Sequence, residues 1–180
     1  SEYVRSRDPR SRIFIVHRLD RDTSGVMIYA KTEEAKLRLQ QSWKDAVPER
    51  VYYAIVAGNV AKDKDTIRSW LKETKTLRMY SSPVPNGGQE AVTHYKVLQR
   101  SAEYSLLEVR LATGRKNQIR VHLEAIGHPV VGDKKYGSRH NPLGRLGLHA
   151  GTIRFVHPRT QETMRFSSPL PRSFRRLFKI

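Results

Sequence analysis

Short apolar runs separated by polar loops dominate the sequence of this chain. Residues 13–16, 26–30 and 50–58 are apolar runs rich in β-branched and aromatic side chains. Residues 90–99 and 103–111 predict two further strands, and the second alternates apolar with polar positions. Runs of this length and composition are typical of β-strands. The short connection between the last two runs predicts that they form a hairpin.

Two stretches instead repeat apolar residues at helical spacing. The apolar faces hold Ala35, Leu39 and Trp43 in the first stretch, and Ile119, Leu123 and Ile126 in the second. Thr32 can cap the start of the first helix, and Val47-Pro48 ends it. Gly127, followed closely by a proline, gives the second helix a C-terminal stop.

The remaining segments give weaker signals. Residues 1–12 carry four arginines and little that could pack, which predicts an exposed basic arm. Residues 59–89 predict one or two short strands and an exposed loop, and residues 146–150 and 152–156 predict two further short strands. The sequence has no internal repeat, so we expect a single domain over residues 13–180.

The net charge of the chain indicates what kind of partner it binds. Of its 180 residues, 34 are Lys or Arg and 17 are Asp or Glu, which gives a formal net charge of +17. So large an excess indicates a polyanionic partner, and nucleic acid fits best. An anionic membrane surface is disfavoured, because no long helix combines an apolar face with a basic one. No apolar stretch approaches the length of a membrane span.

Cysteine is absent, which excludes disulfides, cysteine-based zinc sites and thiol catalysis. Seven histidines are present, but none shows a metal-ligand spacing. We expect His149 and His157 to be structural. We therefore expect no metal and no cofactor. Because the sequence does not begin with an apolar secretory signal, we expect a cytoplasmic protein.

The polar loop between the first two predicted strands is the strongest candidate for chemistry. It reads His-Arg-Leu-Asp-Arg-Asp-Thr-Ser-Gly over residues 17–25. An aspartate in a turn most often caps backbone N–H groups, and Asp20 could do only that. Arg18 and Arg21 flank it, however, and their charges favour an ionised carboxylate. An ionised carboxylate without a metal can act as a nucleophile or a general base.

Four segments of the chain resemble motifs of one known family. Residues 17–25, followed by Ala30-Lys31, resemble the signature HRLDxxTSG…AK of the RluA-type pseudouridine synthases, which modify RNA. Residues 50–58 are similar to K-x-Y-x-A-x-V-x-G, residues 114–137 to GRxxQIRxHLxxxGHPxxGDxxYG, and residues 145–171 to RLxLHAxxLxFxHPxT…FxSPLP. The resemblance implies the pseudouridine synthase fold, an α+β architecture with a mixed, mainly antiparallel sheet and flanking helices.

The resemblance also implies roles for single residues. Asp20 would be the catalytic residue, Arg120 would pair with it, and Tyr52 would stack on a base flipped out of the RNA. Tyr53 would be a structural neighbour. The expected RNA contacts are Arg18, Arg21, Arg115, Lys116, Asn117, Gln118 and His122.

The sequence departs from the family's pattern at two places. Arg50 stands where Lys is usual, and Lys116-Asn117 stands where many relatives carry Thr-His. We expect the second departure to affect RNA contact rather than chemistry. Relatives normally have a strand segment upstream of these motifs, and often a small RNA-binding domain. The chain is therefore expected to be a catalytic domain that lacks its usual N-terminal segment.

Together these expectations give one function and its alternatives. The chain is expected to isomerise uridines in structured RNA as a monomer, with large-subunit ribosomal RNA favoured and transfer RNA as the alternative substrate. A non-catalytic RNA-binding or ribosome-assembly protein would carry the same charge. A magnesium-dependent aspartyl phosphatase would match the D-x-D-x-[TS] pattern that begins at Asp20. That reading is disfavoured, because Gly132-Asp133 lacks the second carboxylate that such a metal site needs.

Overall fold

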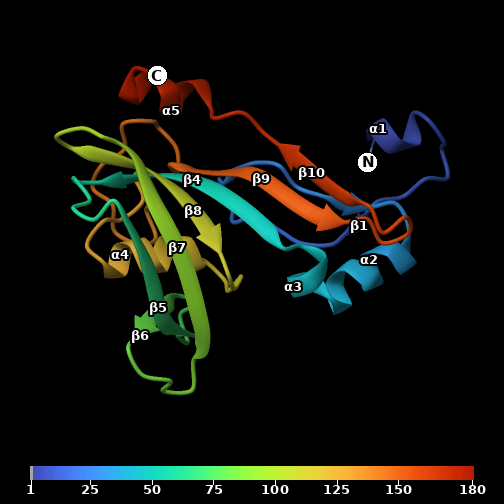
Figure 1. The fold of residues 1–180 in the computed structure, drawn as a ribbon, viewed down its shortest axis with the longest axis horizontal. Helices are drawn as coiled ribbons and strands as arrows, with labels where there is room; N and C mark the ends of the chain where they lie inside the picture. The colour runs from blue at the N-terminus through green and yellow to red at the C-terminus, as the bar shows by residue number, and fades with distance from the viewer. Residues whose placement is uncertain (1) are drawn as a thin grey trace.

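One long antiparallel sheet runs through the computed structural model, which describes residues 2–180 (Figure 1). Its strand order is β10-β9-β4-β8-β7-β5-β6, and neighbours along this path are antiparallel. The strands are β4 Glu49–Ala57, β5 Lys64–Glu73, β6 Met79–Ser82, β7 Gln89–Arg100, β8 Tyr104–Leu111, β9 Leu148–Val156 and β10 Thr163–Ser167. The predicted fold class is confirmed.

A smaller sheet forms around the loop at residues 17–25, called here the Asp20 loop. β1 Phe14–Ile15 pairs antiparallel with β3 Tyr29–Ala30, so the two predicted strands exist but are only two residues long. Between them, β2 Ser24–Gly25 pairs parallel with β9 of the main sheet. The Asp20 loop is therefore fastened to the main sheet at its C-terminal end.

Two short helices lie against the smaller sheet (Figure 1). α2 Glu33–Gln41 begins after Thr32, whose hydroxyl oxygen accepts a hydrogen bond of 3.1 Å from the backbone N–H of Ala35. This cap is the one that the sequence predicts. The single helix expected here is interrupted at Ser42, and the chain continues as α3 Trp43–Ala46.

Each face of the main sheet is covered by one helix. α4 Gln118–Ala125 packs Ile119 and Leu123 onto one face of β4 and β8. α5 Arg172–Phe178, which the sequence pattern does not predict, packs Phe174 onto the other face. Alternate residues of each strand therefore belong to different cores. Within residues 2–180, no helix has the length and apolar character needed to cross a membrane.

The structure confirms some local predictions and corrects others. The predicted hairpin is β7–β8. β9 is one strand rather than two: it continues through Gly151, where the ring of Tyr53 lies 2.4 Å from the position that a Cβ would take. Ile126 is exposed at the end of α4 instead of joining its buried face. The predicted N-terminal arm contains one short helix, α1 Glu2–Arg5, none of whose residues is buried.

Gly25 allows the Asp20 loop to approach β9. Its φ is +124°, and an ideal Cβ would lie 2.1 Å from the carbonyl oxygen of Ala150. We expect Gly25→Ala to lower the free energy of unfolding by about 3 kcal/mol or more, because backbone strain and overpacking combine. Gly137→Ala is the control, since Gly137 has a φ of +81° but nothing within 4 Å. Urea denaturation measures both variants, and equal losses would contradict this account.

Candidate active site

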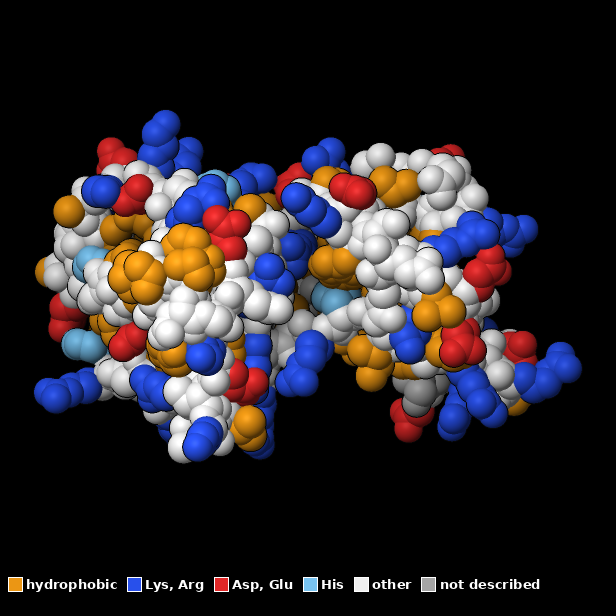
Figure 2. Space-filling view, turned by 90° about the horizontal axis from the view of Figure 1, so that it is seen from below, with side chains coloured by type: hydrophobic (Ala, Val, Ile, Leu, Met, Phe, Trp, Pro, Cys, Tyr) orange, Lys and Arg blue, Asp and Glu red, His pale blue; other side chains and the backbone are white. Residues whose placement is uncertain are grey.

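A cavity of about 440 Å³ lies beside the Asp20 loop. Its volume is in the range of small-ligand sites, about 300–1,000 Å³. Figure 2 shows the molecule hollowed between a lobe with α2 and α3 and a lobe with α4, β5 and β6. The side chains that line the cavity include Asp20, Trp43, Arg50, Tyr52, Leu111, Ile119 and Leu148. The lining thus mixes apolar and aromatic side chains with polar and charged ones, among them Arg18, Arg50 and Arg115.

A second hollow, of about 890 Å³, adjoins this cavity and shares Asp20 with it. Its lining is strongly basic and includes Arg18, Arg21, Arg115, Lys116, Lys134, Lys135 and Arg145. Lysines and arginines gather along the hollowed face in Figure 2. Asp20 therefore lies where a cavity of mixed lining, with several aromatic and aliphatic side chains, meets a more strongly basic hollow.

The carboxylate of Asp20 is held through one of its two oxygens. Oδ2 accepts hydrogen bonds from Nδ2 of Asn117 at 2.8 Å and from Nη1 of Arg120 at 3.2 Å. Within residues 2–180, no protein group donates a hydrogen bond to Oδ1. The side chain of Asp20 is 25% exposed. One oxygen is therefore fixed by the protein, and the other remains available for a ligand.

Arg120 joins Asp20 to a second, buried carboxylate. Its Nε and Nη2 donate to the two oxygens of Asp133 at 2.7 and 2.8 Å, and the side chain of Asp133 is 0% exposed. The backbone N–H groups of Lys135 and Tyr136 also donate to Asp133, at 3.0 and 3.1 Å. Burial disfavours the charged form of Arg120, but its bonds to Asp133 and Asp20 outweigh this and raise its pKa above the ordinary value.

The two neighbouring tyrosines of β4 face opposite sides of the sheet. Tyr52 lines the cavity, whereas Tyr53 packs with the core under α5, as a structural residue would. Burial raises the pKa of the Tyr52 phenol, the charge of Arg50 lowers it and that of Asp20 raises it again. Tyr52 is therefore neutral at physiological pH and presents an aromatic surface to the cavity.

Arg50 is a partly buried cation on the wall of the cavity. Its Nε is buried without a hydrogen-bond partner, and its guanidinium carbon lies 5.9 Å from the centre of the Trp43 ring. Burial lowers the pKa of Arg50, and Tyr52 raises it in part. His17 also packs against Trp43, and the centres of the two rings lie 5.1 Å apart. Burial and the charge of Arg50 lower the pKa of His17 to about 4, so His17 is neutral at pH 7.

The residues predicted to contact RNA fall into two groups. Arg18, Arg21, Arg115 and Lys116 line the hollows and are at least partly exposed. Gln118 and His122 are buried, at 2% and 0% exposed, although Gln118 borders the cavity beside Asp20. Their contacts with RNA stay predictions. Gln118 bonds internally to β7, and His122 lies between Ser69 and Thr93.

Asn117 bonds to the candidate catalytic residue, a contact that the sequence analysis did not predict. It is 8% exposed and borders both hollows, so the departure at this position touches Asp20 as well as the lining that would meet RNA. Its contact with RNA stays a prediction. Asp133 and Tyr136 are site residues that the sequence analysis did not single out, although both lie within the segment matched at residues 114–137. The partners of Asp133 lie within that segment, and Tyr136 bonds both to Asn117 within it and to Met79 outside it. The motif alone does not show which of its side chains meet.

The described residues offer no evident metal site. Within residues 2–180, no group of three or more His, Asp or Glu side chains is arranged to hold a metal ion. The nearest charged partner of Asp20 is instead the guanidinium of Arg120. The described residues therefore do not provide, around Asp20, the set of metal ligands that the phosphatase alternative requires.

Comparisons with known proteins agree on one family. A family model described as RNA pseudouridylate synthase matches residues 1–125. The uncharacterized RNA pseudouridine synthase YjbO of Bacillus subtilis (strain 168) is 38% identical, over 94% of this chain and 60% of its own length. Ribosomal large subunit pseudouridine synthase D of Neisseria meningitidis serogroup A is 38% identical, over 89% of this chain and 46% of its own length.

A solved structure gives the same result. Human RNA pseudouridylate synthase domain containing 1 aligns with a TM-score of 0.78 and 28% identity, over 93% of this chain and 72% of that one. The chain therefore belongs to the RNA pseudouridylate synthase family. It spans between 46% and 60% of the length of the two bacterial relatives named above.

The buried Asp133 should contribute strongly to stability. We expect Asp133→Asn to lower the free energy of unfolding by about 3 kcal/mol, because it leaves the Arg120 charge poorly compensated in a buried position. Asp65→Asn is the control, since Asp65 pairs with Lys62 at the surface, and surface ion pairs contribute little to stability. Urea denaturation at pH 7 measures both losses. A loss at Asp133 no larger than that at Asp65 would show that the buried pair does not stabilise the fold.

Proposed function

We propose that this chain converts uridine to pseudouridine in RNA and that Asp20 is its catalytic residue. The observation that carries the proposal is the state of the Asp20 carboxylate, whose Oδ2 is bonded while Oδ1 has no donor among residues 2–180. It lies beside a cavity with an aromatic and apolar wall. Membership of the RNA pseudouridylate synthase family supports the same chemistry.

The reaction needs no redox step and no second substrate. The bond between C1′ of the ribose and N1 of uracil breaks, and C1′ then bonds to C5 of the same base. C5 loses its proton, and N1 gains one, so atoms and electrons balance. Asp20 would either attack the nucleoside or remove a proton from it. Arg120 would keep the carboxylate charged and oriented throughout.

The target base would leave its stack and enter the cavity. Tyr52 offers it an aromatic face, and unstacking costs least in single-stranded or irregular RNA. The basic hollow next to Asp20 would hold the phosphates that flank the flipped nucleotide, through Arg18, Arg21, Arg115 and Lys116. Asp20, which borders both cavities, would then contact the nucleoside at the place where they join.

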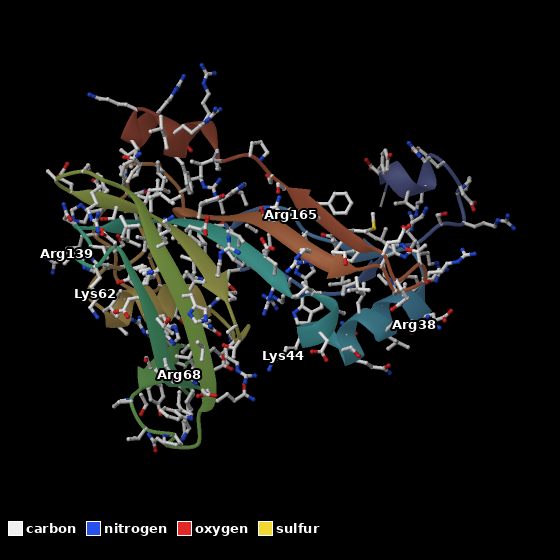
Figure 3. The ribbon with its side chains drawn as sticks, in the orientation of Figure 1. Arg38, Lys44, Lys62, Arg68, Arg139 and Arg165 are labelled. Atoms are coloured by element: carbon white, nitrogen blue, oxygen red, sulfur yellow. The ribbon has the colours of Figure 1, made fainter. Side chains whose placement is uncertain are left out.

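Further basic side chains lie outside the cavity, although Arg38, Arg68 and Arg165 are each paired with a glutamate. Figure 3 labels cations on several elements, among them Arg38 on α2, Lys44 on α3, Arg68 on β5 and Arg165 on β10. A structured RNA could therefore be bound over a surface wider than one nucleotide, and its affinity would fall steeply with salt.

The substrate we favour is large-subunit ribosomal RNA, with transfer RNA second. The support is the Neisseria meningitidis relative, which is named ribosomal large subunit pseudouridine synthase D. We also propose that the chain acts in the cytoplasm, as a monomer and without a metal. The remaining alternative is a non-catalytic RNA-binding protein, which the following experiment separates from an enzyme.

We expect Asp20→Asn to lose activity without losing RNA binding. The assay measures tritium released from transcripts labelled at uridine C5, made from ribosomal and transfer RNA, in buffer without magnesium. The rate should fall at least about 100-fold, the scale for loss of a catalytic base or nucleophile. Asp22→Asn, in the same loop, should retain most of the rate. Release by Asp20→Asn at the native rate would refute the role of Asp20. No release by the native chain, despite RNA binding, would favour the binding-protein alternative.

A further inference from the structure

Asn117 sits at an unusual backbone position next to Asp20. It immediately precedes α4, and its φ of +54° and ψ of +21° are in the left-handed region. Few residue types adopt this conformation readily, and asparagine is one of them. The position therefore accepts asparagine without great strain and directs its side chain into the protein, where it is buried.

The orientation of the Asn117 amide is determined by its partners. Lys135 Nζ donates to Oδ1 at 3.2 Å, and lysine has no acceptor. The Tyr136 hydroxyl lies 2.9 Å from the same oxygen and itself accepts a hydrogen bond of 3.2 Å from the Met79 N–H. Its single proton is thus free to go to Asn117. With two donors on Oδ1, the amide must direct its Nδ2 group toward Asp20.

Arg120 alone would leave the Asp20 carboxylate free to pivot. Its two short bonds go to Asp133, and it reaches Asp20 with one remaining nitrogen at 3.2 Å. A single bond to one oxygen does not fix the plane of a carboxylate. The bond from Asn117, at 2.8 Å, supplies a second donor from a different direction.

We propose that Asn117 is a positioning residue, which holds Oδ2 of Asp20 so that Oδ1 is the oxygen that meets the nucleoside. The proposal rests on the proposed function and adds to it a chain of hydrogen bonds. This series of hydrogen bonds runs from the backbone of Met79 in β6 through Tyr136 to Asn117 and ends on Asp20. It connects the β5–β6 side of the molecule to the reacting group.

Asn117→Gly tests this role without disturbing the backbone, because glycine also adopts the left-handed conformation. We expect the single-turnover rate at saturating RNA to fall about 10- to 100-fold, the scale for losing one hydrogen bond to a charged group. The Kd for RNA should change less than about twofold, because the side chain is buried. Asn86→Gly is the matched control, since Asn86 also has a positive φ, +40°, but is exposed. An unchanged rate for folded Asn117→Gly would overturn the proposal.

Tyr136→Phe tests whether the chain of hydrogen bonds acts through Asn117. Alone, this substitution should lower the rate, because the amide loses one of the donors that orient it. In the Asn117→Gly background it should have no further effect on the rate, since its target is gone. Equal effects of Tyr136→Phe in both backgrounds would show that Tyr136 does not act through Asn117 and that the series of hydrogen bonds does not affect the rate.

A measurement without RNA separates this proposal from the proposed function. The side-chain amide protons of Asn117 can be followed by NMR and assigned by their loss in Asn117→Gly. They should exchange slowly with water in the native chain and faster in Asp20→Ala, because the acceptor is removed. Equal exchange in both would overturn the positioning role even in an active enzyme. Protection in the native chain together with inactivity on every RNA would count against the proposed function alone.

Discussion

The buried ion pair between Arg120 and Asp133 is the interaction on which the candidate site depends. Two charges removed from water cost several kcal/mol each unless hydrogen bonds compensate them. Here Asp133 accepts two bonds from Arg120 and two from backbone N–H groups, so the pair is well satisfied. This arrangement leaves Nη1 of Arg120 directed at Asp20, so α4 and the loop after it determine where the carboxylate of Asp20 lies.

The Asp20 loop is held in place from three directions. Its end pairs with β9 through Gly25, where no side chain would fit. Arg145 donates hydrogen bonds to Ser24 and to the carbonyl of Leu148, at 2.8 and 3.1 Å. Asn117 and Arg120 hold its carboxylate from α4. Segments distant in sequence thus meet at Asp20, between the cavity that holds Tyr52 and the basic hollow. In the proposed function, the cavity would take the base and the basic hollow its phosphates.

The sequence predicted the features that depend on local chemistry. The Thr32 cap, the β7–β8 hairpin and the apolar face of α4 at Ile119 and Leu123 follow from spacing and residue type alone. It could not predict contacts between distant segments, such as β2 on β9. Polar residues of α4 were expected at the surface, yet tertiary hydrogen bonds bury them, and no local pattern distinguishes the two cases. The contacts of Asn117 could not be predicted because its side-chain partners lie in two other segments, the Asp20 loop and the loop that holds Lys135 and Tyr136.

The most direct test of this account is a crystal structure of the chain bound to an RNA that carries its target uridine. The measurements are the position of the base and its distance from each oxygen of Asp20. The account predicts that the base lies against Tyr52, that Oδ2 keeps its bonds to Asn117 and Arg120, and that Oδ1 is the oxygen nearest the nucleoside. A base bound outside the cavity, or an Asp20 carboxylate turned away from Arg120, would contradict it.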